Sequence, residues 1–87
     1  MAILTPVTCK AARAGLDVPM RDLARLADIS TNTLVRFESG AELRERTLQA
    51  IQATLEAAGA TFLEDDGNGP GVRLQPRTDA DQPPASV

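Results

Sequence analysis

The feature that most constrains the fold is a pair of short helix-forming stretches, residues 19–27 and 31–39, separated by a break at 28–30. In the first stretch, apolar residues recur at helical spacing; they are Leu23, Ala24, Leu26 and Ala27. The break combines Asp28, which tolerates the left-handed conformation of a tight turn, with Ser30, which favours the start of a helix. Leu34 and Phe37 form a buried pair in the second stretch. The pattern predicts two short helices that meet at a tight turn.

A helix is also predicted before this pair. Thr5 followed by Pro6 is a start signal, because a hydroxyl can cap the first turn and proline suits the first helical position. The apolar positions that recur at helical spacing are Cys9, Ala12 and Leu16. Gly15 and the pair at 18–19 are predicted to end this helix, since the residue before a proline avoids helical geometry.

A fourth helix is predicted after Gly40, which ends the third because glycine takes the left-handed position past a helix end without cost. It begins between Arg44 and Thr47 and ends near Ala58, before Gly59. Its apolar stripe is Leu48, Ile51, Leu55 and Ala58.

Two short strands, 60–63 and 71–74, follow the helices and are joined by a segment with turn composition. An isolated hairpin is marginal in water, so this one must pack on the helices or pair with another chain. From Gln75 onward the chain is polar and contains proline, which predicts a disordered tail. The expected organisation is a helical unit at 1–59, a hairpin and dimerisation element at 60–74, and a tail at 75–87.

Composition excludes several classes of function. The 87 residues include one cysteine, Cys9, and no histidine, so neither a disulfide framework nor a zinc site is expected, and we expect no cofactor. Cys9 is interpreted as a small buried apolar residue. Without a histidine, a motif cysteine or a phosphate-cradling loop, an enzyme is not expected. No stretch is long enough for a membrane span and the N-terminus lacks a signal peptide, so a cytoplasmic protein is predicted.

The charge is unevenly distributed along a chain of net charge −3. Residues 1–46 hold seven basic and six acidic side chains, whereas residues 47–87 hold two basic and six acidic ones. The acidity therefore lies mostly in the C-terminal half, and a basic face on the N-terminal half is compatible with the sequence.

The paired helices resemble the helix-turn-helix of the XRE family, the Cro and phage-repressor type of regulator. The resemblance covers about residues 5–74 and rests on Leu-Ala-x-x-Ala at 23–27, Ile-Ser at 29–30, Thr-Leu at 33–34 and Phe-Glu-Ser-Gly at 37–40. The downstream segments 47–51 and 55–59, and Phe62 with the turn and strand at 67–72, add to it. It implies a mostly α, lambda-repressor-like domain of four to five helices with a short C-terminal β-hairpin. It also implies a two-fold dimer that binds a near-palindromic DNA operator and regulates transcription.

The resemblance implies that the third helix lies in the major groove. Thr31, Asn32 and Arg36 would then read bases, because asparagine pairs with adenine, arginine with guanine, and a threonine methyl contacts thymine. The expected phosphate contacts position the protein without reading sequence; the candidates are Ser30, Thr33, Arg44 and Arg46, with Arg21 on the second helix. Arg21 and Arg25 are equally well interpreted as a solvated face.

Departures from the family pattern leave a second interpretation open. The second helix opens with Pro19-Met20 where the family usually has Ser-Gln, and Asp28 stands at a turn position that is often glycine. Asp22, Asp28 and Glu42 would lie near a phosphate backbone. The alternative is a protein-binding module of the same fold, an antiactivator that sequesters another regulator without binding DNA.

Other polar residues have structural interpretations. Glu38 is expected to be a local hydrogen-bond or salt-bridge partner and not a functional acid. The acidic run 64–66 is expected to be a solvated turn, since it lacks the ligand spacing of a calcium loop. If the protein is a homodimer, the candidate surfaces are the fourth helix after Thr47 and the strand around Val72, because an open strand edge invites pairing.

Overall fold

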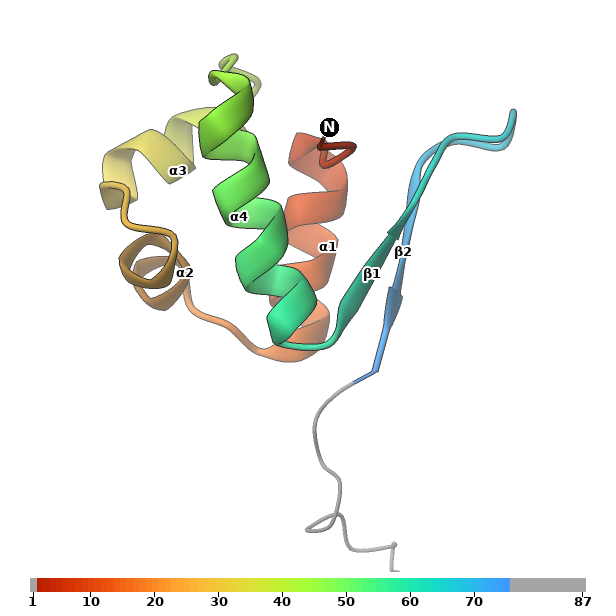
Figure 1. The fold of residues 1–87 in the computed structure, drawn as a ribbon, viewed down its shortest axis with the longest axis horizontal. Helices are drawn as coiled ribbons and strands as arrows, with labels where there is room; N and C mark the ends of the chain where they lie inside the picture. The colour runs from red at the N-terminus through yellow and green to blue at the C-terminus, as the bar shows by residue number, and fades with distance from the viewer. Residues whose placement is uncertain (1, 76–87) are drawn as a thin grey trace, which may run out of the picture.

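Four helices precede a two-stranded antiparallel sheet in the computed structural model, which describes residues 2–75. The helices are α1 (Pro6–Leu16), α2 (Met20–Leu26), α3 (Thr31–Glu38) and α4 (Glu45–Ala57), and the strands are β1 (Ala60–Leu63) and β2 (Gly71–Leu74). In Figure 1, α2 and α3 lie on one side of α1 and α4, and the hairpin lies on the other. Apart from Gln75, the predicted tail lies outside the described residues.

Helix α1 begins as predicted, with a capping box. The Thr5 hydroxyl accepts a hydrogen bond from the backbone N–H of Thr8 at 3.1 Å, and the Thr8 hydroxyl accepts one from the N–H of Thr5 at 3.0 Å. One of the two signals predicted to end this helix, Gly15, does not do so. Gly15 lies inside the helix, and Asp17 at φ 59° forms the left-handed cap. Gly15 instead makes room for the Leu74 side chain, which occupies the space that a Cβ atom would need.

Helices α2 and α3 meet at the predicted turn, and Asp28 has the expected left-handed conformation at φ 61°. Leu23 and Ala24 are buried in α2, and Ala27 is buried just after it. The prediction for Leu26 is wrong, because this side chain is 59% exposed. At about 100° per residue, Leu23, Ala24 and Ala27 share one side of the helix and Leu26 points away from that side.

Helix α4 begins and ends within the predicted limits and supplies the centre of the core. Ile51 and Leu55 are fully buried, whereas Leu48 is half-buried. After Ala58 the chain reverses at Gly59, whose φ of 121° few other residues adopt. The Gly59 carbonyl then accepts a hydrogen bond from the N–H of Gln75 at 2.7 Å, which closes the base of the hairpin.

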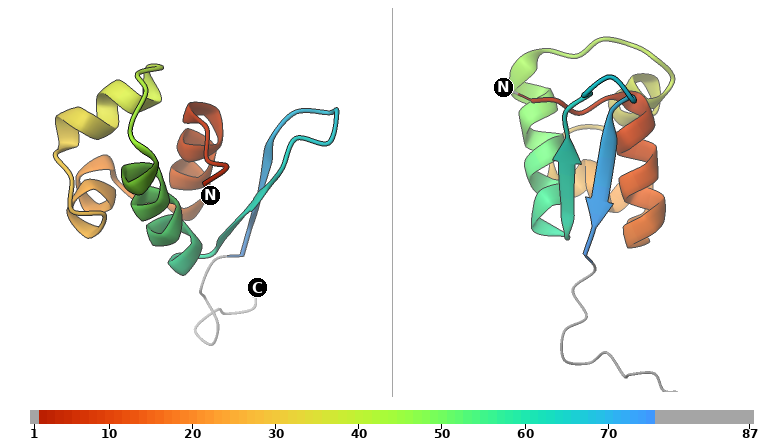
Figure 2. Two further views of the ribbon diagram at one scale, coloured as in Figure 1. Left: turned by 45° about the horizontal axis from the view of Figure 1, so that its top comes forward. Right: turned by 90° about the vertical axis from the view of Figure 1, so that its right-hand side faces the viewer.

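The predicted hairpin forms, and it packs on the helices. Ala60 pairs with Leu74 and Phe62 with Val72, and these residues face inward, with Ala60 and Phe62 buried. Figure 2 shows the two strands lying across α1 and α4, and both strands contact α1. In the connecting turn, one Asp65 carboxylate oxygen accepts hydrogen bonds from the N–H groups of Gly67 and Gly69, at 2.9 and 2.8 Å.

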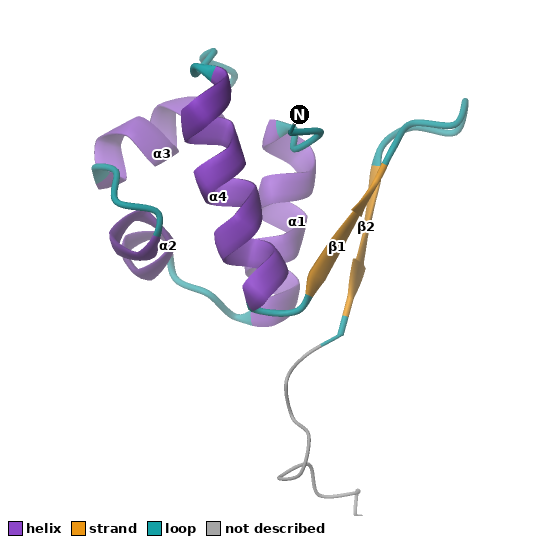
Figure 3. Cartoon of the chain, in the orientation of Figure 1, coloured by secondary structure: helices purple, strands orange, loops and turns teal. Residues whose placement is uncertain are grey.

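One hydrophobic core joins all these elements, which Figure 3 distinguishes by type. Both aromatic side chains, Phe37 and Phe62, are buried in it, and its largest fully buried members are Leu23, Leu34, Ile51 and Leu55. No helix among the described residues is long and apolar enough to cross a membrane.

Candidate nucleic-acid interface

The outer face of α3 is defined here as the exposed residues of this helix and its C-terminal cap: Thr31, Asn32, Val35, Arg36 and Ser39. At 3.6 residues per turn these positions form one contiguous strip. The opposite side of α3 is buried through Leu34, Phe37 and Glu38. The three predicted base readers, Thr31, Asn32 and Arg36, therefore lie together. The hairpin lies on the opposite side of α1 and α4 from α3 and does not cover α3 (Figure 1).

The hydroxyls of Ser30 and Thr33, which were predicted to contact phosphate, take part in local interactions at the start of α3. The Ser30 hydroxyl accepts a hydrogen bond from the Thr33 N–H at 3.0 Å and lies 2.8 Å from the Thr33 hydroxyl. Thr33, a predicted phosphate contact, is half-buried and does not belong to the outer face. The Ser30 hydroxyl caps α3, as the choice of Ser30 for the helix start predicted.

The inner side of α3 carries a buried ion pair with α1. Arg13 donates two hydrogen bonds to the Glu38 carboxylate, from Nε to Oε2 and from its terminal nitrogen to Oε1, both at 2.8 Å. The Cys9 thiol donates a third, to Oε2 at 3.2 Å. The Glu38 side chain is 5% exposed and that of Arg13 is 21% exposed. Glu38 is thus the structural salt-bridge partner that was predicted, although its partners lie on another helix.

The environment of this cluster changes the acidity of its members. Burial alone would raise the pKa of Glu38, but the hydrogen bonds from Arg13 and Cys9 and the positive charges of Arg13 and Lys10 outweigh it, so the pKa is lowered from 4.5. Burial and the adjacent carboxylate raise the pKa of Cys9 to about 12. The thiol is therefore protonated at neutral pH and is unsuited to nucleophilic chemistry.

No sequence pattern indicated a partner for Arg13. The residues of the pair are 25 positions apart. A helix-surface rule relates only residues three or four apart, so no local pattern could have found this contact.

The remaining predicted phosphate contacts are exposed and come from α2 and from the start of α4. Arg21 is exposed on α2, and the neighbouring Arg25 lies 3.7 Å from the Asp22 carboxylate. Arg44 and Arg46 are exposed at the start of α4, beyond the loop that follows α3. Asp28 and Glu42, before and after α3, are exposed as well.

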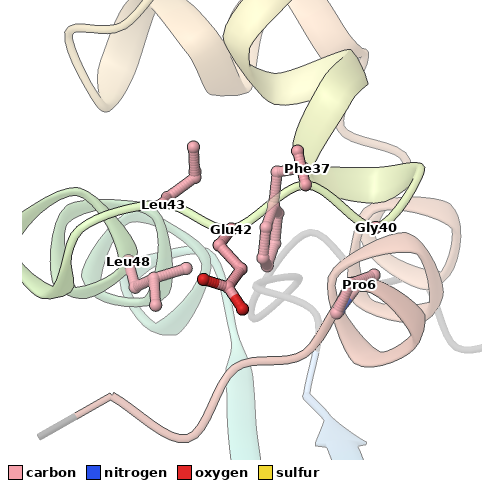
Figure 4. A pocket seen from close by; sticks show the side chains of 7 residues that line it. Pro6, Phe37, Gly40, Glu42, Leu43 and Leu48 are labelled. Atoms are coloured by element: carbon pink, nitrogen blue, oxygen red, sulfur yellow. The ribbon is translucent and has the colours of Figure 1, made fainter.

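A groove of about 310 Å³ lies between α1, the α3–α4 loop and α4. Figure 4 shows the Glu42 side chain extending between Pro6 and Leu48, with Phe37 behind it. None of the predicted DNA-contacting residues lines this groove. Among residues 2–75, no three acidic, histidine or cysteine side chains gather to hold a metal ion.

The Asp65 carboxylate accepts backbone hydrogen bonds within the hairpin turn. The backbone N–H groups of Gly67 and Gly69 lower its pKa, and the side chain is at the surface of the hairpin turn. The acidic run 64–66 is accordingly an exposed turn, as predicted.

The chain matches no protein-family model and no curated protein sequence.

Proposed function

We propose that this protein is a cytoplasmic, sequence-specific DNA-binding regulator of transcription, a repressor or a dual regulator, that places α3 in the major groove. The observation on which this rests is the outer face of α3. Within residues 2–75, the side chains of Thr31, Asn32 and Arg36 on this face make no hydrogen bond or ion pair with another residue. Asparagine and arginine are the side chains that pair with adenine and guanine edges.

The charge of α3 supports the same proposal. Its single acidic residue, Glu38, is turned inward and neutralised by Arg13. The outer face therefore carries the positive charge of Arg36 and no carboxylate. Because phosphates repel acidic groups and attract basic ones, a helix with this distribution can enter a groove that an acidic helix could not.

The lambda-repressor-like fold and the two-fold dimer expected from the resemblance to XRE regulators belong to this proposal. Among residues 2–75, each strand of the sheet has one neighbour, so the outer edges of β1 and β2 offer backbone groups to a second copy. The Val72 side chain faces the core, so this strand would contribute its edge and not its side chain. A dimer predicts that the preferred DNA sequence is an inverted repeat.

Selection from a pool of random duplexes, followed by affinity measurement on the sequence obtained, tests the proposal. We expect Asn32→Ala with Arg36→Ala to lose sequence preference, since each bidentate contact contributes roughly 1 to 3 kcal/mol of discrimination. The matched control is Lys10→Ala with Asn68→Ala, which removes one positive charge and one carboxamide from exposed positions outside α3 and the strands.

The control variant should select the same sequence as the unmodified protein with the same affinity. Circular dichroism should report an unchanged helix content in both double variants, because all four residues are exposed. Undiminished selection by the Asn32/Arg36 variant would contradict the assigned readers, and the absence of any selected sequence would contradict the function.

A protein partner in place of DNA is the alternative. It is favoured by the exposure of Leu26, which is 59% exposed on α2, and by the exposed carboxylates of Asp28 and Glu42 on either side of α3. Apolar side chains at protein interfaces are commonly rimmed by charge. In this case no duplex is enriched, whatever the salt concentration.

A further inference from the structure

An unassigned apolar side chain lies in the middle of the outer face of α3. Val35 is 43% exposed, although the neighbouring residues on this face are polar. It follows Thr31 by four positions and Asn32 by three, so its side chain lies one turn along the helix beside both. Its position among hydrogen-bonding side chains that we propose read bases distinguishes it from the other large exposed apolar residues of the described part of the chain, which are Val7, Leu26 and Leu63.

Folding does not require valine at this position. The inner contacts of α3 are made by Leu34, Phe37 and Glu38, and Val35 is absent from the buried core and from the residues packed against it. Valine has a lower helix propensity than alanine, because its branched Cβ loses rotamer freedom in a helix. An exposed valine on an 8-residue helix therefore adds nothing to α3 that alanine would not.

We propose that Val35 is a specificity-determining residue that contacts the C5-methyl group of a thymine in the major groove. The inference rests on the proposed function. Thymine is the one base that presents a methyl group at this edge, and aliphatic side chains recognise it by apolar contact. The partner is DNA and not an apolar protein surface because Arg36 follows Val35 directly, and the outer face has no carboxylate to repel phosphate.

The test removes the methyl group from the DNA and the side chain from the protein, separately and together. Thymines in the selected duplex are replaced one at a time by deoxyuridine, which lacks only the C5-methyl group, and dissociation constants are measured by fluorescence anisotropy. At one thymine in each half-site we expect an affinity loss of about fourfold, which corresponds to the ~0.8 kcal/mol of one buried methylene-sized group.

Val35→Ala should bind the thymine duplex with an affinity about fourfold lower than that of the unmodified protein. Replacing the contacted thymine by deoxyuridine should then lower the affinity of this variant no further. The matched control is Val7→Ala, an equally small change at a valine that is 70% exposed on α1. It should retain the full effect of deoxyuridine. Neither variant should alter the dependence of affinity on salt, because neither residue is charged.

Two results would overturn the inference, and they are distinguishable. If the unmodified protein binds a selected sequence but no thymine shows a loss that Val35→Ala abolishes, Val35 does not read a methyl group, and the proposed function stands. If the unmodified protein enriches no sequence, the proposed function fails and the inference fails with it.

Discussion

The two faces of α3 differ in the contacts that they make with the rest of the protein. The inner face is fully occupied: Leu34 and Phe37 pack in the core, and Glu38 accepts hydrogen bonds from Arg13 and Cys9. The outer face has five exposed side chains, with no intramolecular hydrogen bond or ion pair among residues 2–75. A helix of 8 residues is unstable alone in water, so the inner contacts must maintain it. The outer face is thereby free of any role in folding and available for a partner.

Truncation of two adjacent residues on opposite faces of α3 should affect stability very differently. Leu34→Ala should lower the free energy of unfolding by about 2 to 5 kcal/mol, because it opens a cavity at a fully buried position. Val35→Ala, the matched control, should change it by no more than about 0.5 kcal/mol. Urea denaturation followed by circular dichroism measures both. Equal destabilisation by the two substitutions would mean that the faces are not distinct.

A smaller effect is expected from the buried ion pair. Glu38→Gln keeps the shape of the side chain but removes the charge that balances Arg13, and should cost about 2 kcal/mol. This is below the ~3 to 5 kcal/mol of fully buried pairs because Arg13 retains partial exposure. Glu42→Gln makes the same chemical change at an exposed position and should leave stability unchanged in the same denaturation experiment. A neutral effect of Glu38→Gln would show that the apolar contacts alone hold the inner face.

The smallest expected effect is the pH dependence of the stability difference between the unmodified protein and Glu38→Gln. Glu38 has a lowered pKa in the folded protein, so the stability it contributes is present above its unfolded value near 4.5 and is lost as the pH falls through the folded value. The stability difference between the unmodified protein and Glu38→Gln should therefore be constant from about pH 6 to pH 8 and narrow below pH 4.5. Denaturation curves at several pH values measure it. A difference that widens on acidification would have the wrong sign for an ionised Glu38.

Most element boundaries could be predicted because their signals are local. Thr5, Ser30 and Gly59 act on groups within a few residues, through a cap or a backbone conformation, and the structure places each at the expected end. The exposure of Asn32 and Arg36 followed in the same way from the burial of Leu34 and Phe37. The prediction that Leu26 is buried was wrong because periodicity shows which residues share a side of a helix. It does not show how much of that side the neighbouring elements cover.

Caps, turns and helical periodicity act over a few residues, so the amino-acid sequence predicts where the helices begin, where the chain turns, and which side chains of the third helix project from it. Tertiary structure alone decided that Arg13 neutralises Glu38 and that Gly15 admits Leu74. These partners are 25 and 59 positions apart, and only the packing of whole elements against one core brings such distant atoms into contact.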